Sequence, residues 1–170
     1  MSRTDLPASL GALQPSPGLG GPAEDDRGRR VSLHFRLREF DFRGDPGFAA
    51  APALYPEDWL FDRLLPLCRA LEGIRGACGG RAVRVLSGYR PPAYDAARRA
   101  AGHTGVAEHS QHGEGRAADI QIGGVEPRQI YEAAQALYLR SQIRIGGLGL
   151  YRDFVHVDVR PGKRLVTWEG

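Results

Sequence analysis

The chain has 170 residues, which is enough for one domain with a hydrophobic core and too few for two ordinary ones. Its mean hydropathy is -0.36, and no apolar run approaches the roughly 18 to 20 residues of a membrane-spanning helix, which excludes an integral membrane protein. The 23 basic and 20 acidic residues give a net charge of +3. Because the basic residues do not alternate with aromatic ones, we expect no nucleic-acid partner.

Residues 1–30 show neither helical nor strand periodicity. Prolines and glycines gather between residues 15 and 22, and a run of mixed charge follows at residues 24–27. This composition predicts a disordered N-terminal tail over residues 1–30 and a single domain over residues 31–170. The N-terminus has no continuous apolar segment of the kind found in secretory signal peptides, so we expect no such signal.

Four elements are predicted in the first part of the domain. Apolar and polar residues alternate over residues 31–37, which predicts a short strand or extended segment. Apolar residues then recur at steps of three and four over residues 56–76, which predicts an amphipathic helix. A strand over residues 82–86 and a short alanine-rich helix over residues 91–101 follow.

The second part continues the mixture of strands and helices. A polar stretch with three of the five histidines comes first. The elements predicted after it are a buried strand at 116–122, a helix at 126–138, two extended segments forming a hairpin at 146–151 and 154–159, and a closing strand at 165–168. Helices mixed irregularly with short strands predict an α+β domain.

Potential metal ligands are concentrated on two segments. They are His103, His109, His112 and Asp119 on the first, and His156 and Asp158 on the second. A catalytic zinc ion takes about three imidazole or carboxylate ligands and leaves one position open for water, a count that His112, Asp119 and His156 would meet. In an extended segment, His156 and Asp158 point to one face and the neighbouring valines to the other. A carboxylate within an apolar strand, such as that of Asp119, is costly unless it is paired or bound to a metal.

Three segments resemble a known family. Residues 110–119, Ser-Gln-His-Gly-Glu-Gly-Arg-Ala-Ala-Asp, match the Ser-x-His-x-x-Gly-x-Ala-x-Asp signature of the zinc D-Ala-D-Ala carboxypeptidases and L-Ala-D-Glu endopeptidases. Ser-Gly-Tyr-Arg at residues 87–90 and Phe-Val-His-Val-Asp at residues 154–158 resemble two further elements of these peptidoglycan peptidases. The resemblance covers about residues 31–168. It implies the Hedgehog-like α+β fold, a small, mainly antiparallel sheet flanked by helices.

The resemblance also implies a role for each matching residue. His112, Asp119 and His156 would bind one zinc ion per chain. Asp153, three residues before the last ligand, would be the general base, and Arg90 would stabilise the oxyanion or bind a substrate carboxylate. The expected reaction is hydrolysis of a peptide bond in peptidoglycan stem peptides, by a carboxypeptidase or an endopeptidase. Three further residues would contact substrate or support the ligands: Tyr89, Ser110 and Asp158.

Two alternatives remain open. Asp153 reaches the metal-bound water only if residues 152–153 form a turn or bulge, because residues three apart on a strand face opposite sides. Otherwise Glu108, Glu114 or His109 becomes the candidate base. The second alternative replaces the enzyme by a non-catalytic binding module for the cell wall or a protein, in which zinc only stabilises the same fold.

The substrate lies outside the cytoplasm. We therefore expect the protein to act at the cell wall, in the periplasm or outside the cell, after synthesis in a bacterial or phage-infected cytoplasm. Because no export signal is recognised, release as a phage endolysin or delivery by a secretion machine would account for its passage.

Overall fold

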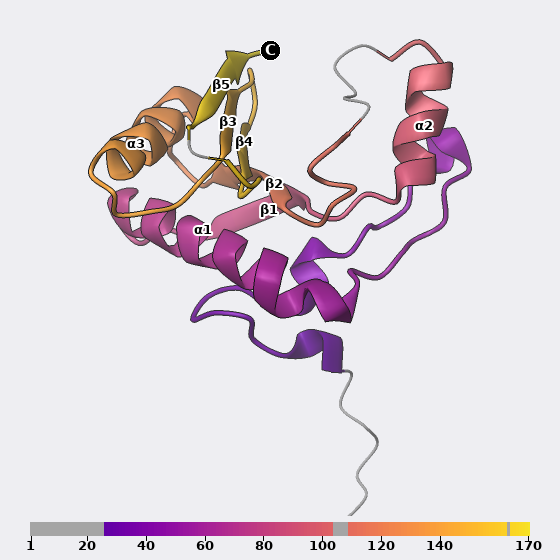
Figure 1. Cartoon of the computed structure of the whole chain (residues 1–170), viewed down its shortest axis with the longest axis horizontal. Coiled ribbons are helices and arrows are strands. Elements are labelled where there is room, and N and C mark those ends of the chain that lie inside the picture. The colour runs from indigo at the N-terminus through magenta and orange to yellow at the C-terminus, as the bar shows by residue number, and fades with distance from the viewer. Residues whose placement is uncertain (1–25, 104–108, 163) are drawn as a thin grey trace, which may run out of the picture.

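Five strands form one mixed sheet in the order β1-β2-β4-β3-β5 (Figure 1). The computed structural model describes residues 26–103, 109–162 and 164–170. The strands are β1 (Val83–Ser87), β2 (Ala117–Ile122), β3 (Gly147–Leu150), β4 (Val155–Asp158) and β5 (Val166–Glu169). Neighbouring strands run antiparallel except β3 and β5, which are parallel. The predicted α+β class and the predicted hairpin, β3 followed by β4, are confirmed.

Three α-helices and several short helical turns accompany the sheet. They are α1 (Leu65–Ala77), α2 (Pro92–Ala100), α3 (Pro127–Leu139), the 3-10 turns η1 (Asp26–Gly28), η2 (Leu37–Phe40), η3 (Pro46–Phe48) and η4 (Glu57–Trp59), and the π turn η5 (Leu60–Leu64). Helices α1 and α3 pack on each other and on the strands, whereas α2 packs on η3 (Figure 1). Of the helices in the described ranges, none combines the length and hydropathy needed to cross a bilayer.

The helix predicted over residues 56–76 is a composite. It begins as η4 and η5, and regular α-helix starts only at Leu65. Pro66 has no backbone N–H, so it cannot form the α-helical hydrogen bond to the carbonyl of Asp62. That carbonyl instead accepts a hydrogen bond from Nη1 of Arg116 at 3.4 Å. The proline therefore accounts for the irregular first turns. The hydrogen bond from Arg116 connects these turns to the start of β2.

The segment over residues 31–37, predicted as a short strand or extended segment, forms a tight turn closed by an isolated bridge between Arg30 and Arg36. The backbone N–H groups of Val31 and Ser32 both donate to the carbonyl of Phe35, at 2.9 and 3.3 Å. This tight turn leaves Leu33 69% exposed while Phe35 is buried. The alternation of residues is thus produced by a turn that inserts one aromatic side chain into the core, and no partner strand is paired.

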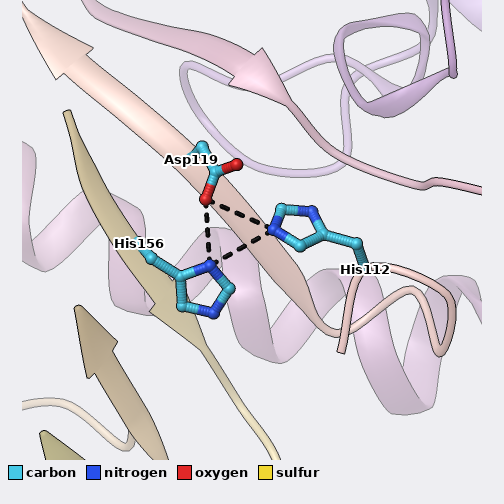
Figure 2. Close-up of side chains that lie close together, drawn as sticks. All are labelled: His112, Asp119 and His156. Atoms are coloured by element: carbon cyan, nitrogen blue, oxygen red, sulfur yellow. Dashed lines mark hydrogen bonds and ion pairs between the residues drawn. The ribbon is translucent and has the colours of Figure 1, made fainter. Parts of the chain in front are cut away.

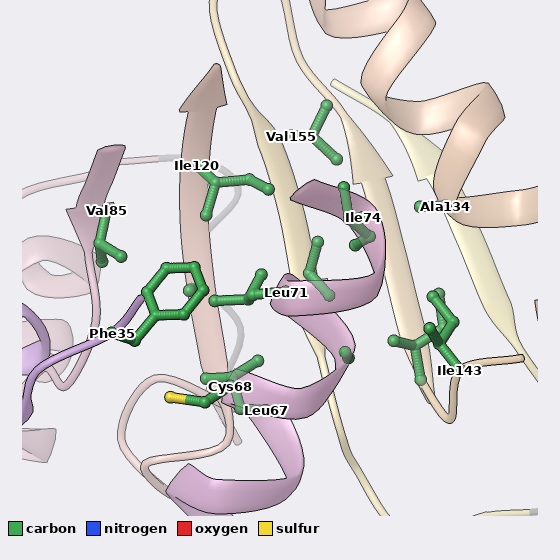
Figure 3. Packing of buried hydrophobic residues seen from close by; sticks show 14 of the residues in the cluster. Phe35, Leu67, Cys68, Leu71, Ile74, Val85, Ile120, Ala134, Ile143 and Val155 are labelled. Carbon is green, nitrogen blue, oxygen red and sulfur yellow. The ribbon is translucent and has the colours of Figure 1, made fainter. Parts of the chain in front are cut away.

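The core lies between the helices and one face of the sheet. Leu71 and Ile74 of α1 lie beside Ile120 of β2 and Val155 of β4 (Figure 3). Cys68 is buried in the same cluster, and this burial raises the pKa of its thiol. Because side chains alternate along a strand, the residues between these apolar ones point to the opposite face of the sheet. That second face carries the candidate site.

The first described residues already contact the domain. Arg27 is buried, pairs with Asp41 and donates from Nη1 to the backbone carbonyl of Tyr55 at 3.1 Å. Residues 26–30 of the predicted tail therefore pack against the structure. Residues 1–25 lie outside the described residues.

Candidate metal centre and active site

Two neighbouring strands and one loop bring three potential ligands together. Asp119 of β2 is paired directly with His156 of β4 in the antiparallel register, so their side chains share a face. His112 comes from the turn that precedes β2 and points toward both (Figure 2). One ligand atom of each residue lies within 4.8 Å of the other two. All three residues are buried, His112 being only 1% exposed.

The distances fit a small tetrahedral cation. Asp119 Oδ1 lies 3.2 Å from His112 Nε2 and 2.9 Å from His156 Nδ1, and the two ring nitrogens are 3.2 Å apart. Zinc at its usual ligand distances in tetrahedral geometry would separate its donor atoms by about 3.3 Å. Two imidazoles and one carboxylate are also the donor set of catalytic zinc sites. The residues present therefore fit the ion that the sequence resemblance implies.

The outer nitrogen of each histidine has an acceptor of its own. His112 Nδ1 donates to the backbone carbonyl of Gly88 at 2.7 Å, and His156 Nε2 lies 3.2 Å from Asp158 Oδ2. When the outer nitrogen carries the proton, the inner nitrogen presents its lone pair, which is the usual arrangement around a metal-bound histidine. Gly88 can bring its carbonyl to this position because glycine has no Cβ. A Cβ here would come within 2.6 Å of Phe40 Cα.

Burial and mutual contacts shift the pKa values of the three residues in different directions. Burial acts to raise the pKa of Asp119, but interactions with His112 and His156 outweigh it and hold that pKa below the ordinary 3.8. Burial lowers the pKa of His112. Burial acts in the same direction on His156, yet hydrogen bonds to Asp119 and Asp158 outweigh it and raise its pKa. The shifts favour an ionised Asp119 and a neutral His112, as metal binding requires. The raised pKa of His156 instead favours its protonated form, which must lose a proton before Nδ1 can bind a metal.

A cavity of about 340 Å³ opens beside His112 and His156. Its wall includes the predicted residues Arg90, His109 and Ser110, together with Tyr151, Arg160 and Trp168. Asp119 does not line it, so the ligand cluster is accessible from the histidine side.

Arg90 is held by contacts to two parts of the site. Its backbone N–H donates to the carbonyl of His112 at 3.2 Å, and its Nε lies 3.5 Å from Oδ1 of Asp95. Asp95 is buried in the first turns of α2, and neither carboxylate oxygen has a hydrogen-bond partner among the described residues. Within the described ranges, this buried carboxylate forms its ion pair with Arg90, whose side chain also lines the cavity.

Tyr89 lies apart from this cavity. Its ring packs against Tyr55 and Trp59, with centroids 6.1 and 5.9 Å away. It lines a separate cavity next to β1 and α2, which shares Arg90 with the first. The structure thus places this predicted substrate contact in an aromatic cluster outside the cavity that His112 and His156 line.

Asp153 lies in the turn between β3 and β4. Tyr151 N–H donates to the Phe154 carbonyl at 3.0 Å, closing the turn, and Gln121 Nε2 donates to the Asp153 carbonyl at 2.7 Å. The carboxylate side chain is 75% exposed and does not line the cavity with the ligands. The turn that the sequence analysis required is present, while the acid side chain points to solvent in this arrangement.

The other candidate bases are placed differently. Glu114 is exposed and pairs with Arg63 at 3.3 Å. His109 lines the cavity beside the ligands. Glu108 lies outside the described residues.

Tyr151 and Arg160 line the cavity, although neither was predicted from the sequence as a site residue. Tyr151 accepts a hydrogen bond from Trp168 Nε1 at 3.0 Å, and the Trp168 ring lies 5.2 Å from that of His156. Neither Tyr151 nor Arg160 belongs to one of the three matched motifs. The position of Arg160, two residues after Asp158, is the one signal that could have placed it near the ligands.

Comparisons with known proteins agree with the site. A family model described as "Peptidoglycan L,D-endopeptidase MepK" matches residues 57–165, which include all three potential ligands. The probable peptidoglycan L,D-endopeptidase MepK of Haemophilus influenzae is 37% identical over 90 residues, covering 52% of this chain and 43% of the relative. Peptidoglycan L,D-endopeptidase MepK of Escherichia coli K12 is 35% identical over 106 residues, covering 61% and 51%. The chain thus aligns with about half the length of these relatives. No solved structure gave a significant match.

Proposed function

The chain belongs to the peptidoglycan L,D-endopeptidase MepK family, and from this premise we propose that it is a zinc-dependent peptidase acting on peptidoglycan stem peptides. The observation that carries the proposal is the buried His112, Asp119 and His156 cluster at the wall of a cavity. The names of the relatives favour an endopeptidase over a carboxypeptidase. We also propose that the protein acts at the cell wall, after delivery by a phage or secretion partner.

The chain's own residues supply binding and proton transfer. The two histidines and Asp119 would hold zinc, which when bound polarises a carbonyl and makes water acidic near neutral pH. Arg90 faces the cavity and would donate hydrogen bonds to the oxygen on which negative charge develops, or to a substrate carboxylate. The wall formed by Tyr151 and Trp168 would exclude bulk water from one side of the peptide.

The proton of the attacking water needs an acceptor. We propose the carboxylate of Asp153 for this role, on the strength of its spacing from His156 in the family motif. His109 is the second candidate because its ring lines the cavity. A base at either position would later return the proton to the leaving amine.

The proposal is tested on purified peptidoglycan digested with the full chain, with the products identified by mass spectrometry. We expect cleavage that is lost after chelation, regained with zinc and absent in His156→Ala. A protein that retains one zinc per chain but cleaves neither carboxypeptidase nor endopeptidase substrates would instead be the non-catalytic binding module of the same fold.

A further inference from the structure

We infer that Arg160 is a second carboxylate-binding residue of this site, and that the substrate carries a carboxylate on each side of the bond that is cut. The inference rests on the proposed peptidase function and names the chemistry of its substrate. Its evidence is the fixed position of the Arg160 guanidinium, its place across the ligand cluster from Arg90, and its share of the same cavity.

The guanidinium of Arg160 is held in place from two sides. Its Nε lies 2.9 and 3.0 Å from the two carboxylate oxygens of Asp158, and Nη2 also contacts Oδ2. The Arg160 backbone N–H donates to the same carboxylate at 3.0 Å. The Trp168 ring centroid lies 5.5 Å from Cζ. An arginine fixed in this way loses little further rotamer entropy when it binds a ligand.

The backbone of β3 leaves room for this arrangement. A Cβ on Gly147 would come within 2.8 Å of Arg160 Nη2 and would overlap the carboxylate of Asp158. Gly147 is paired with Asp158 across the strands. The arginine therefore lies over β3, on the face of the sheet that carries the ligands.

Arg90 and Arg160 flank the ligand cluster. The strand order is β1-β2-β4-β3-β5. Arg90 follows β1, at one edge of the sheet, whereas Arg160 lies over β3 beside Trp168 of β5. The strands between them carry Asp119 and His156. A peptide that crosses the cavity over the ligands would meet one guanidinium at each end.

The free side of Arg160 is suited to an anion. The side chain is 31% exposed, and Nη1 makes no hydrogen bond to a residue in the described ranges. Asp158 already neutralises one charge, yet the fork keeps the N–H donors of Nη1, and the side chain lines the cavity beside the ligand cluster. On a peptide substrate, the group that matches a guanidinium is a carboxylate. Two such groups select peptides with acidic functions on both sides of the scissile bond.

The test uses three synthetic stem peptides. One has free carboxylates on both residues that flank the scissile bond, and each of the others has one of these two carboxylates converted to the amide. We expect wild-type kcat/KM to fall roughly 10- to 100-fold for each amidation, the range for losing a charged hydrogen bond. In Arg160→Gln, amidation of the carboxylate that Arg160 binds should leave kcat/KM almost unchanged. Amidation of the other carboxylate should still lower kcat/KM by its full factor. Arg128→Gln, the same charge change on a residue outside the cavity, should behave as wild type.

Two results would overturn the inference. In the first, Arg160→Gln lowers kcat/KM equally for all three peptides, which would show that Arg160 merely supports Asp158. In the second, Arg160→Gln leaves kcat/KM unchanged for all three peptides. Metal content is measured in each variant, because a loss of zinc would also lower all three rates together.

A binding measurement separates this inference from the proposed function. The same peptides with the scissile amide replaced by a non-hydrolysable methylene-amine link are titrated calorimetrically against the full chain. If no peptide is cleaved by the wild type, the peptidase proposal fails. Arg160 is then judged by whether Arg160→Gln removes the affinity difference between the free and the amidated analogue.

Discussion

Asp158 Oδ2 lies 3.2 Å from His156 Nε2, while Nδ1 of the same imidazole faces Asp119 at 2.9 Å. The two strand residues point to the same face, and the side chain of Asp158 is 0% exposed. Burial acts to raise the pKa of Asp158, but hydrogen bonds from His156 and Arg160 outweigh it and hold that pKa at about 2. The ionised carboxylate therefore orients the imidazole so that Nδ1 is the nitrogen presented to a metal.

Replacing Asp158 by asparagine should weaken zinc binding. An amide accepts a weaker hydrogen bond and can present its N–H₂ group to the ring, so we expect a loss of roughly 10- to 100-fold in affinity. Competition with a chromogenic chelator measures this directly. Glu132→Gln removes the same charge from the exposed side of α3 and should leave the affinity unchanged. Unchanged affinity in Asp158→Asn would show that Asp158 does not orient the ligand.

Removal of zinc should lower the melting temperature. The three ligands are buried together, and a ligand that binds only the folded state stabilises it by about 2.7 kcal/mol at a hundred times its Kd. Thermal unfolding with zinc and with a chelator gives the difference. His112→Ala lacks one donor and should melt at nearly the same temperature in both conditions. Identical curves for the wild type would speak against a metal site in this fold.

The two candidate bases are distinguished by a pair of variants. If Asp153 accepts the proton, Asp153→Asn should lower kcat by about 100-fold or more, as expected for loss of a general base. Zinc content should stay the same, because Asp153 does not touch the ligand cluster. His109→Gln should then cost much less. The reverse order would assign the proton to His109, whose ring lines the cavity.

Asp95 should act through Arg90. Its carboxylate is buried with Arg90 Nε 3.5 Å away, so Asp95→Asn would leave the guanidinium without its fixed counter-charge and lower kcat/KM by about 10-fold. Zinc affinity should not change. The decisive measurement is a double-mutant cycle, in which Asp95→Asn has no further effect on kcat/KM once Arg90 is glutamine. Additive losses would mean that Asp95 only stabilises the fold.

Acid should remove the stability contributed by Glu72. Burial acts to raise the pKa of Glu72, but hydrogen bonds from Ser32 and His34 outweigh it, so the folded pKa lies below the ordinary 4.5. The stabilisation is therefore present above pH 4.5 and is lost as the pH falls through the folded value. We expect Glu72→Gln to be destabilised by about 1 kcal/mol near neutral pH, with the difference shrinking as the pH falls below the ordinary pKa of 4.5 and through the lower folded value. Denaturant unfolding across this range measures it, and a constant difference would contradict the assignment.

Local sequence patterns determined much of this molecule. The motif at residues 110–119, with the histidine strand at 154–158, was enough to predict the three residues that meet in the ligand cluster. Hydrophobic periodicity predicted α1, α3 and the strands, because burial of one face imposes a repeat that can be read from neighbouring residues. It failed at residues 31–37, where a tight turn produces the same alternation as a strand.

The tertiary structure decided what surrounds the ligands. Trp168 of β5, which runs parallel beside β3, contacts both Tyr151 and Arg160 at the cavity wall. These contacts depend on strand order and on how separate segments pack. A one-dimensional pattern records which residues must be buried, whereas the partners that meet across a cavity are set by the folded arrangement of the whole chain.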